Sequence, residues 1–227
     1  VRAEHHIAEV EERRPEDPES YWRELRARYF GNVTVLDRGI EPILAALEES
    51  GQADDTIVVF TSDHGDSLGD RGMINKRAFY DEVARVPLIV HVPWFSDGEQ
   101  RIGGSIGHTD LVPTLLDLMG QDVPDHLQGA SRKEVLTGDA ELVDDVFMQW
   151  HGGAATVPLG NAEVERLSEI PWRCMVSGDR WKLNLSPADT CELYDLNSDP
   201  LELVNLFDHP DHSDRVRAMT DRVLEWQ

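Results

Sequence analysis

The sequence of 227 residues predicts an α/β fold with a small C-terminal α+β subdomain. Between residues 22 and 150, amphipathic helical patterns alternate with short runs of β-branched and aromatic residues, the pattern of a sheet covered by helices on both faces. Beyond about residue 160, predicted strands follow one another and end in a single helix. We therefore expect a charged lead-in at 1–20, a partial α/β domain at 21–160 and a subdomain at 161–227.

The first predicted element is a long amphipathic helix that begins near Trp22. Pro42 lacks a backbone N–H, so we expect it to kink or split this helix. The pairs Arg14-Pro15 and Asp17-Pro18 predict an irregular connector before it. The apolar residues recur every three or four positions and lead to a glycine suited to a C-terminal cap: Leu25, Tyr29, Val33, Leu36, Ile40, Leu44, Leu47 and Gly51.

Two apolar runs predict the next strands, at residues 56–61 and 86–92, on either side of a polar loop at 62–80. The first run is continuous rather than alternating, which is typical of a strand buried on both faces of a mainly parallel sheet. Ligands of such sheets bind beyond the carboxyl ends of the strands, so the loop is the first place to look for chemistry.

The following residues predict one more helix and strand. Thr109 or Asp110 is suited to cap a helix that Gly120 ends. A strand is predicted at residues 146–150. In the C-terminal part, strands at 172–177 and 181–185 form a hairpin, 192–196 adds a third strand, and 213–225 forms the last helix.

The composition excludes several classes of partner and favours a cytoplasmic location. With 44 acidic and 21 basic residues the net charge is −23 at pH 7, which would repel nucleic acid and anionic membranes. No apolar run reaches the roughly 18–20 residues of a membrane span, and the first residues lack the apolar core of a secretion signal. Two cysteines, Cys174 and Cys191, predict free thiols, or a pair if their strands are neighbours.

The residues with the clearest chemical potential are Asp63, His64 and Lys76. Side chains of adjacent residues in a strand point to opposite faces, but a turn through Gly65 allows a carboxylate and an imidazole to meet at one divalent cation. The alternatives are a simple hydrogen bond within the loop and a solvated lysine.

Four segments resemble the successive signatures of the C-terminal half of sulfatases, which belong to the alkaline-phosphatase superfamily. They are SDHGDSLGDRGMINK, YDEVARVPLIVHVP, HTDLVPTLLDLMG and ELYDLNSDPLELVNL, within a resemblance that runs from about residue 28 to 227. With Asp-His in place of Asp-Asn, the chain is similar to choline-sulfatase-like, iduronate-sulfatase-like and phosphonate-monoester-hydrolase-like members. The resemblance implies part of an alkaline-phosphatase-like sheet and metal-dependent hydrolysis of a small sulfate ester.

The resemblance also implies roles for the loop residues. Asp63 and His64 match a pair of metal ligands, and Lys76 matches the lysine that binds a sulfate or phosphate oxygen. Carboxylate ligands suggest Ca²⁺, and the histidine also suits Mn²⁺ or Zn²⁺. Asp66 is expected to order the loop or support the ligands.

Two residues outside these motifs are weaker candidates. Arg85 matches a frequent family position and is interpreted as structural, tying down the loop. His151, which follows a predicted strand beside Gly152 and Gly153, is either a substrate contact or a residue outside the site.

Half of the expected site is missing. The family's nucleophile is a formylglycine made from the first residue of a Cys/Ser-x-Pro-x-Arg motif, and this sequence contains no such motif. The acidic pairs Asp54-Asp55 and Asp144-Asp145 precede their strands, so we expect them at the opposite edge of the sheet. The chain alone is therefore predicted to be inactive.

Three functions remain open at this point. The chain is the C-terminal part of a sulfatase, part of a phosphodiesterase or phosphonate monoester hydrolase of the same superfamily, or an orphaned half-domain with a binding or structural role. In each case a strand edge is expected to need cover, either from a missing N-terminal part or from a homodimer partner.

Overall fold

The computed structural model describes residues 17–76, 78–95, 98–152, 166 and 169–226. Most of the predicted lead-in at 1–20 lies outside these ranges. The chain forms two compact units, Val1–Gly98 and Glu99–Gln227. Both contain helices and open sheets, so the fold is of the α/β class, as predicted. None of the described helices combines the length and the apolar character needed to cross a membrane.

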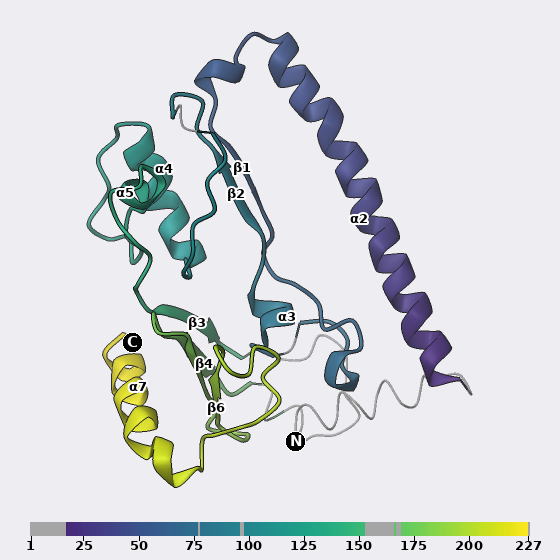
Figure 1. Ribbon diagram of the computed structural model, residues 1–227, viewed down its shortest axis with the longest axis vertical. Helices are drawn as coiled ribbons and strands as arrows, with labels where there is room; N and C mark the ends of the chain where they lie inside the picture. Colours follow the sequence, from purple (N-terminus) through teal and green to yellow (C-terminus); the bar gives the residue numbers. More distant parts are fainter. Residues whose placement is uncertain (1–16, 77, 96–97, 153–165, 167–168, 227) are drawn as a thin grey trace. The chain divides into compact units, whose positions relative to one another are not determined.

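The first unit begins with α2, Pro18–Glu49, which Figure 1 shows as one helix. It starts earlier than predicted because the Asp17 side chain caps it, accepting a hydrogen bond from Ser20 N at 3.2 Å, and Pro18 suits the first turn. Of the two predicted effects of Pro42, a kink or a split, the split does not occur, because a proline removes one backbone hydrogen bond and the turns on both sides supply the rest. Gly51 follows the helix with φ +70°, as its capping role requires.

The first unit also contains β1, Val58–Thr61, and β2, Leu88–His91, with the short helices η1 (Ala53–Asp55), η2 (Asp70–Gly72) and α3 (Asp81–Ala84). The two strands pair antiparallel, with Val59 opposite Val90 and Phe60 opposite Ile89. The expectation of a parallel neighbour and two buried faces is not met, because no other described strand pairs with them and both Phe60 and Ile89 are exposed.

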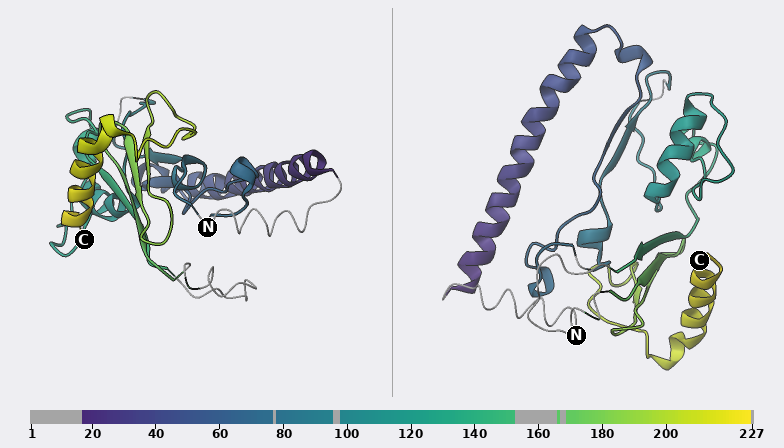
Figure 2. Two further views of the ribbon diagram at one scale, coloured as in Figure 1. Left: turned by 90° about the horizontal axis from the view of Figure 1, so that it is seen from below. Right: turned by 180° about the vertical axis from the view of Figure 1, so that it is seen from behind.

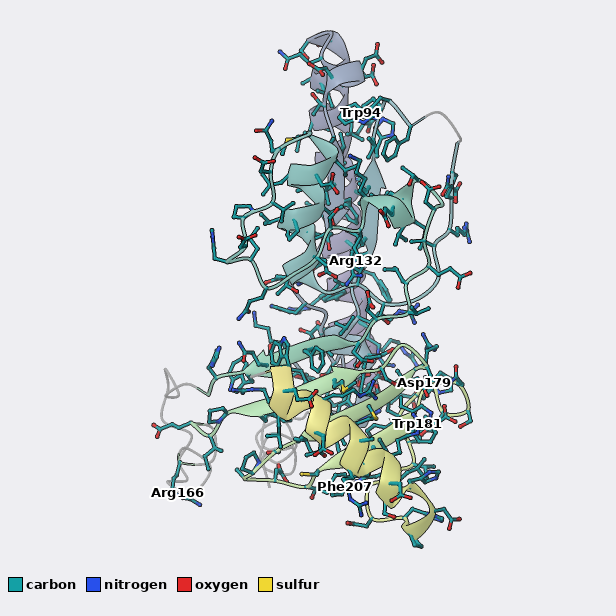
Figure 3. The ribbon with its side chains drawn as sticks, turned by 90° about the vertical axis from the view of Figure 1, so that its left-hand side faces the viewer. Trp94, Arg132, Arg166, Asp179, Trp181 and Phe207 are labelled. Carbon is teal, nitrogen blue, oxygen red and sulfur yellow. The ribbon has the colours of Figure 1, made fainter. Side chains whose placement is uncertain are left out.

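The second unit opens with η3 (His108–Asp110), α4 (Leu111–Leu118) and α5 (Lys133–Leu136). Asp110 precedes α4, but its carboxylate does not cap the helix. It accepts hydrogen bonds from Ala130 N and Arg132 Nε, both at 2.9 Å. Arg132, labelled in Figure 3, also pairs with Asp144, so one guanidinium joins three segments of this unit.

The remainder of the second unit is a four-stranded antiparallel sheet of β3 (Val146–Trp150), β4 (Trp172–Val176), β5 (Trp181–Leu185) and β6 (Glu192–Asp195), in that order. Each strand occupies its predicted range to within one residue. β3 was placed before the boundary at residue 160, yet its partner is β4, beyond that boundary.

The helix α7 (Ser213–Trp226), preceded by η4 (Pro210–His212), packs along one face of this sheet, as Figure 2 shows. Both cysteines are free thiols. The core between helix and sheet consists of residues with 0 or 1% exposure: Met175, Leu183, Leu193, Met219 and Val223.

A buried ion pair lies in the same unit. Lys182 is on β5, and its Nζ is 2.8 Å from Glu202 Oε1, with side-chain exposures of 0 and 1%. Glu202 belongs to the segment after β6 and has φ +55°, a conformation that L-residues adopt only where their surroundings hold them. The pair thus joins that segment to the sheet.

We expect either single substitution of this pair, Lys182→Met or Glu202→Gln, to lower the free energy of unfolding by about 3–5 kcal/mol, because the remaining charge is left buried without its partner. The double substitution should cost less than the sum, since no charge remains. Urea denaturation measures all three, with Arg217→Ala, which removes an exposed pair with Asp214, as the control. Strictly additive losses would contradict this interpretation.

Candidate metal and anion site

The turn after β1 brings together the side chains of Asp63 and His64, although they are consecutive residues. His64 N donates to Asp63 Oδ1 at 2.9 Å, and Ser62 Oγ donates to the His64 carbonyl oxygen at 2.9 Å. The Asp63 side chain is thereby folded back over the next peptide, a common arrangement in turns. As a result Asp63 Oδ2 lies 3.2 Å from His64 Nε2.

The surroundings of the imidazole determine its tautomer. His64 Nδ1 is 2.8 Å from the Gly65 carbonyl oxygen, which only accepts hydrogen bonds, so we assign the proton to Nδ1. Nε2 then carries a lone pair. That lone pair faces the Lys76 ammonium, whose Nζ contacts Nε2. The structure therefore brings the three predicted residues, Asp63, His64 and Lys76, to one place.

Gly65 makes this turn possible because the backbone of α3 lies directly against it. Gly65 N donates to the Val83 carbonyl oxygen at 2.8 Å. A Cβ at position 65 would overlap the Glu82 carbonyl oxygen, so only glycine fits. The requirement here is space rather than an unusual φ.

Asp66 and Ser67 fix the loop that carries Lys76. Asp66 Oδ1 accepts hydrogen bonds from Leu68 N at 3.0 Å and Asn75 N at 3.2 Å. Ser67 donates to the Asn75 carbonyl oxygen twice, from its backbone N and from its hydroxyl, each at 3.0 Å. The two ends of the loop are thus held together immediately before Lys76.

The electrostatics of the site keep Asp63 anionic. The backbone N–H of His64 is the main cause that holds the pKa of the Asp63 carboxyl below its ordinary value, and the charge of Lys76 acts in the same direction. The Asp63 side chain is 81% exposed and that of His64 34%, so the site is open. Among the described residues, no group of three or more His, Cys, Asp or Glu side chains is arranged to hold a metal.

The other predicted residues occupy different surroundings. Arg85 is exposed at the end of α3, and its guanidinium makes no hydrogen bond or ion pair with a described residue. Arg71, which the sequence analysis did not single out, stacks over the Tyr80 ring at 3.8 Å and lies 3.8 Å from Glu82 Oε1. His151 follows β3 in the second unit and is exposed.

The two acidic pairs lie outside the turn after β1. Asp144 pairs with Arg132, and Asp145 accepts hydrogen bonds from Gly178 N at 3.2 Å and Arg222 Nη1 at 2.6 Å. Asp54 and Asp55 form part of η1, which precedes β1.

The class of protein is shown by two family models that match the sequence. The sequence model of the Sulfatase family matches residues 3–121, more than half of the chain, and that of N-sulphoglucosamine sulphohydrolase, C-terminal, matches residues 69–227. The chain therefore belongs to the sulfatase family.

Individual relatives are similar over most of this chain. The choline-sulfatase of Rhizobium meliloti (strain 1021) is 32% identical over 191 residues, which are 83% of this chain and 34% of that protein. The N-acetylglucosamine-6-O-sulfatase of Bacteroides thetaiotaomicron is 30% identical over 199 residues, or 88% and 35%.

Solved structures show the same fold. The phosphonate monoester hydrolase of Agrobacterium radiobacter matches with a TM-score of 0.75 at 27% identity, over 88% of this chain and 40% of that one. A protein solved with its substrate D-glucosamine-2-N,6-O-disulfate matches with a TM-score of 0.73 at 28% identity, over 85% and 38%. The chain thus spans between a third and two fifths of the length of these relatives.

Substituting Gly65→Ala should push the turn away from α3 and lower the free energy of unfolding by about 1–3 kcal/mol, because backbone atoms must move to admit the methyl group. The His64 ring signals in NMR spectra should shift with it. The matched control is Gly31→Ala in α2, where nothing lies within 4 Å of the added carbon and we expect a gain of about 1 kcal/mol. Unchanged His64 signals in Gly65→Ala would contradict the role given to this contact.

Proposed function

We propose that this chain supplies half of a sulfatase-type site, in which Asp63 and His64 bind a divalent metal ion and Lys76 binds a sulfate oxygen. The observation that carries the proposal is the meeting of the three side chains at the turn after β1. Asp66 supports the site by ordering the loop.

The donor atoms fit a cation. Adjacent ligands of an octahedral ion held at about 2.3 Å are about 3.3 Å apart, and Asp63 Oδ2 and His64 Nε2 are 3.2 Å apart. The Nε2 lone pair that would bind the ion faces the Lys76 ammonium here, so ion binding requires that ammonium to turn from Nε2 toward the sulfate group of the substrate. We propose Ca²⁺ as the ion because of the carboxylate, with Mn²⁺ and Zn²⁺ as the alternatives that imidazole favours.

Each residue has a distinct task in this proposal. A bound divalent ion would polarise the ester oxygen of the substrate. Lys76 brings a compact positive charge to the sulfate group, where negative charge accumulates during the reaction. Asp63 stays ionised at neutral pH, and the Gly65 carbonyl oxygen holds the His64 tautomer whose Nε2 is available.

The substrate class follows from the relatives. The names of the two similar sulfatases, and the disulfated glucosamine in a matching structure, support a sulfate ester as substrate. A second candidate is a phosphonate monoester or phosphodiester, favoured by the match to the phosphonate monoester hydrolase. The third candidate, a binding module without activity, would retain the fold but not the ion.

Two ligands do not complete a site for a hard ion, which takes six to eight. The formylglycine motif does not occur in the sequence, and the acidic pairs Asp54-Asp55 and Asp144-Asp145 precede their strands rather than follow them. We therefore propose that hydrolysis needs an N-terminal sulfatase part and that the chain alone has no activity.

The surface of the first unit supports such a partner. On α2 the apolar side chains of Val33, Leu36, Ile43 and Leu44 are 43–69% exposed, and on the strands Phe60 and Ile89 are exposed as well. We propose that the N-terminal sulfatase part covers this surface, since these relatives are more than twice as long as the chain. A second copy is disfavoured because each carries a net charge of −23.

A Mn²⁺ titration followed by NMR tests the metal site in the chain as it is. We expect paramagnetic broadening of the His64 ring signals at low Mn²⁺ concentration, and its loss in Asp63→Asn, because one of two ligands is then neutral. Asp54→Asn, an exposed acidic residue in η1, is the matched control and should leave the broadening unchanged.

The titration is carried out at physiological ionic strength, which screens diffuse attraction of cations to this acidic protein. Equal broadening in Asp63→Asn and in the unsubstituted chain would overturn the metal assignment.

Mixing this chain with an N-terminal sulfatase part tests whether that part supplies the rest of the site. The probe is the segment encoded upstream of this chain or, where none is encoded, the part of the Rhizobium meliloti choline-sulfatase that the chain does not match. We expect no hydrolysis of an aryl sulfate by the chain alone, and a one-to-one complex with the probe in analytical ultracentrifugation.

Leu36→Glu should weaken this complex because it places a charge in the apolar contact, whereas Ala45→Glu should not. Position 45 lies nine residues, or two and a half turns, from position 36 and so on the opposite side of the helix. A stable homodimer that Leu36→Glu dissociates would show that a second copy covers the surface instead. Metal-dependent hydrolysis by the chain alone would contradict the half-site.

A further inference from the structure

The loop between the metal ligands and Lys76 has an unusual backbone. Leu68, Arg71 and Asn75 have φ values of 47°, 54° and 66°, and Gly69 and Gly72 have 96° and 71°. Residues other than glycine seldom adopt such values, and they persist where surrounding contacts determine them. The loop therefore depends on contacts that hold these residues in their positive-φ conformations.

Part of the support is internal. Gly69 N donates to Met73 O at 2.8 Å, Asp70 N to Ser67 O at 2.7 Å, and Met73 N to Asp70 O at 2.9 Å. These bonds close the tip of the loop, while Asp66 and Ser67 join its two ends. None of them attaches the loop to another element.

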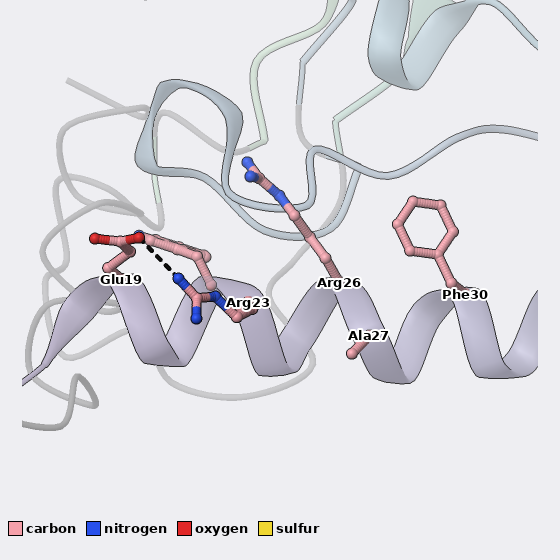
Figure 4. A pocket seen from close by; sticks show the side chains of 6 residues that line it. Glu19, Arg23, Arg26, Ala27 and Phe30 are labelled. Atoms are coloured by element: carbon pink, nitrogen blue, oxygen red, sulfur yellow. Dashed lines mark hydrogen bonds and ion pairs between the residues drawn. The ribbon is translucent and has the colours of Figure 1, made fainter.

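Besides the contact of Arg71 with Glu82 of α3, the loop is attached to the first turns of α2. Arg26 Nε donates to the Leu68 carbonyl oxygen at 2.9 Å, and Arg26 Nη2 lies 3.2 Å from Asp70 Oδ1. The Trp22 ring lies against Gly69, where an added Cβ would be 2.6 Å from a ring carbon. Figure 4 shows Arg26 extending away from the helix, whereas Arg23 beside it pairs with Glu19 on the helix itself.

We propose that Arg26, with Trp22, is a positioning residue that holds the tip of the loop and thereby keeps Lys76 against His64. This inference rests on the proposed function, since it gives α2 a role in placing the sulfate-binding lysine. The connection is short: Arg26 holds Leu68, Leu68 N and Asn75 N share one oxygen of Asp66, and Asn75 precedes Lys76.

The test compares Arg26→Ala, Arg26→Lys and the control Arg28→Ala by NMR in the chain as it is. Within the described ranges Arg28 bonds only to Glu24 on the same exposed helix face, so its loss should leave the loop unchanged. In Arg26→Ala we expect amide exchange at Gly69, Asp70 and Met73 to rise about tenfold, as for the loss of a charged hydrogen bond. The nuclear Overhauser contact between the Lys76 and His64 side chains should disappear.

Arg26→Lys should restore part of that contact, because a lysine can reach either Leu68 O or Asp70 but not both. If Arg26 only stabilises the loop, Arg26→Ala should speed amide exchange there and leave the Lys76–His64 contact intact. That result would overturn the proposal. The metal assignment can fail independently of the positioning role. If Mn²⁺ does not broaden the His64 signals, the metal assignment is wrong, but loss of the Lys76–His64 contact in Arg26→Ala would still support the positioning role.

Discussion

The candidate site depends on the close approach of Gly65 to the backbone of α3. The hydrogen bond from Gly65 N to Val83 O ends β1 in a turn and leaves no space for a side chain at position 65. Because the chain turns there, two consecutive side chains that a strand would direct to opposite faces meet instead. The Gly65 carbonyl oxygen then determines which imidazole nitrogen of His64 carries the proton.

The two units differ in how completely they bury apolar surface. The second unit has a closed core between α7 and its sheet, and a buried ion pair that attaches the segment after β6. In the first unit a two-stranded sheet and a long helix leave many apolar side chains exposed. The proposed half-site therefore lies in the unit whose apolar surface is incompletely covered, and that exposed surface agrees with the limited share of the relatives' length that the chain spans.

Positive charge is scarce in this acidic protein, so the placement of each cation matters. Arg132 joins three segments of the second unit, Arg26 holds the tip of the loop, and Lys182 is fully buried against Glu202. Lys76 differs from these because, in the part of the chain that the structure describes, its partner is an imidazole rather than a carboxylate. An ammonium without a paired carboxylate retains its attraction for an incoming anion, as the proposed sulfate-binding role requires.

The sequence by itself determined the positions of the strands, of α4 and of α7 in the second unit, the capping glycine after α2, and the candidate residues Asp63, His64 and Lys76. These depend on local periodicity, on turn chemistry and on motifs, all of which are read from neighbours along the chain. It also showed that the given sequence contains no nucleophile motif, because the order of its residues settles that question.

Only the tertiary structure decided the rest, because it depends on contacts between residues far apart in sequence. The antiparallel pairing of β1 with β2, the pairing of β3 with β4 and the use of Asp110 as a partner of Arg132 rather than a cap are of this kind. So is the contact from Arg26 to the loop, 42 residues away, for which no sequence pattern exists. A motif names the residues of a site, and packing decides whether they meet.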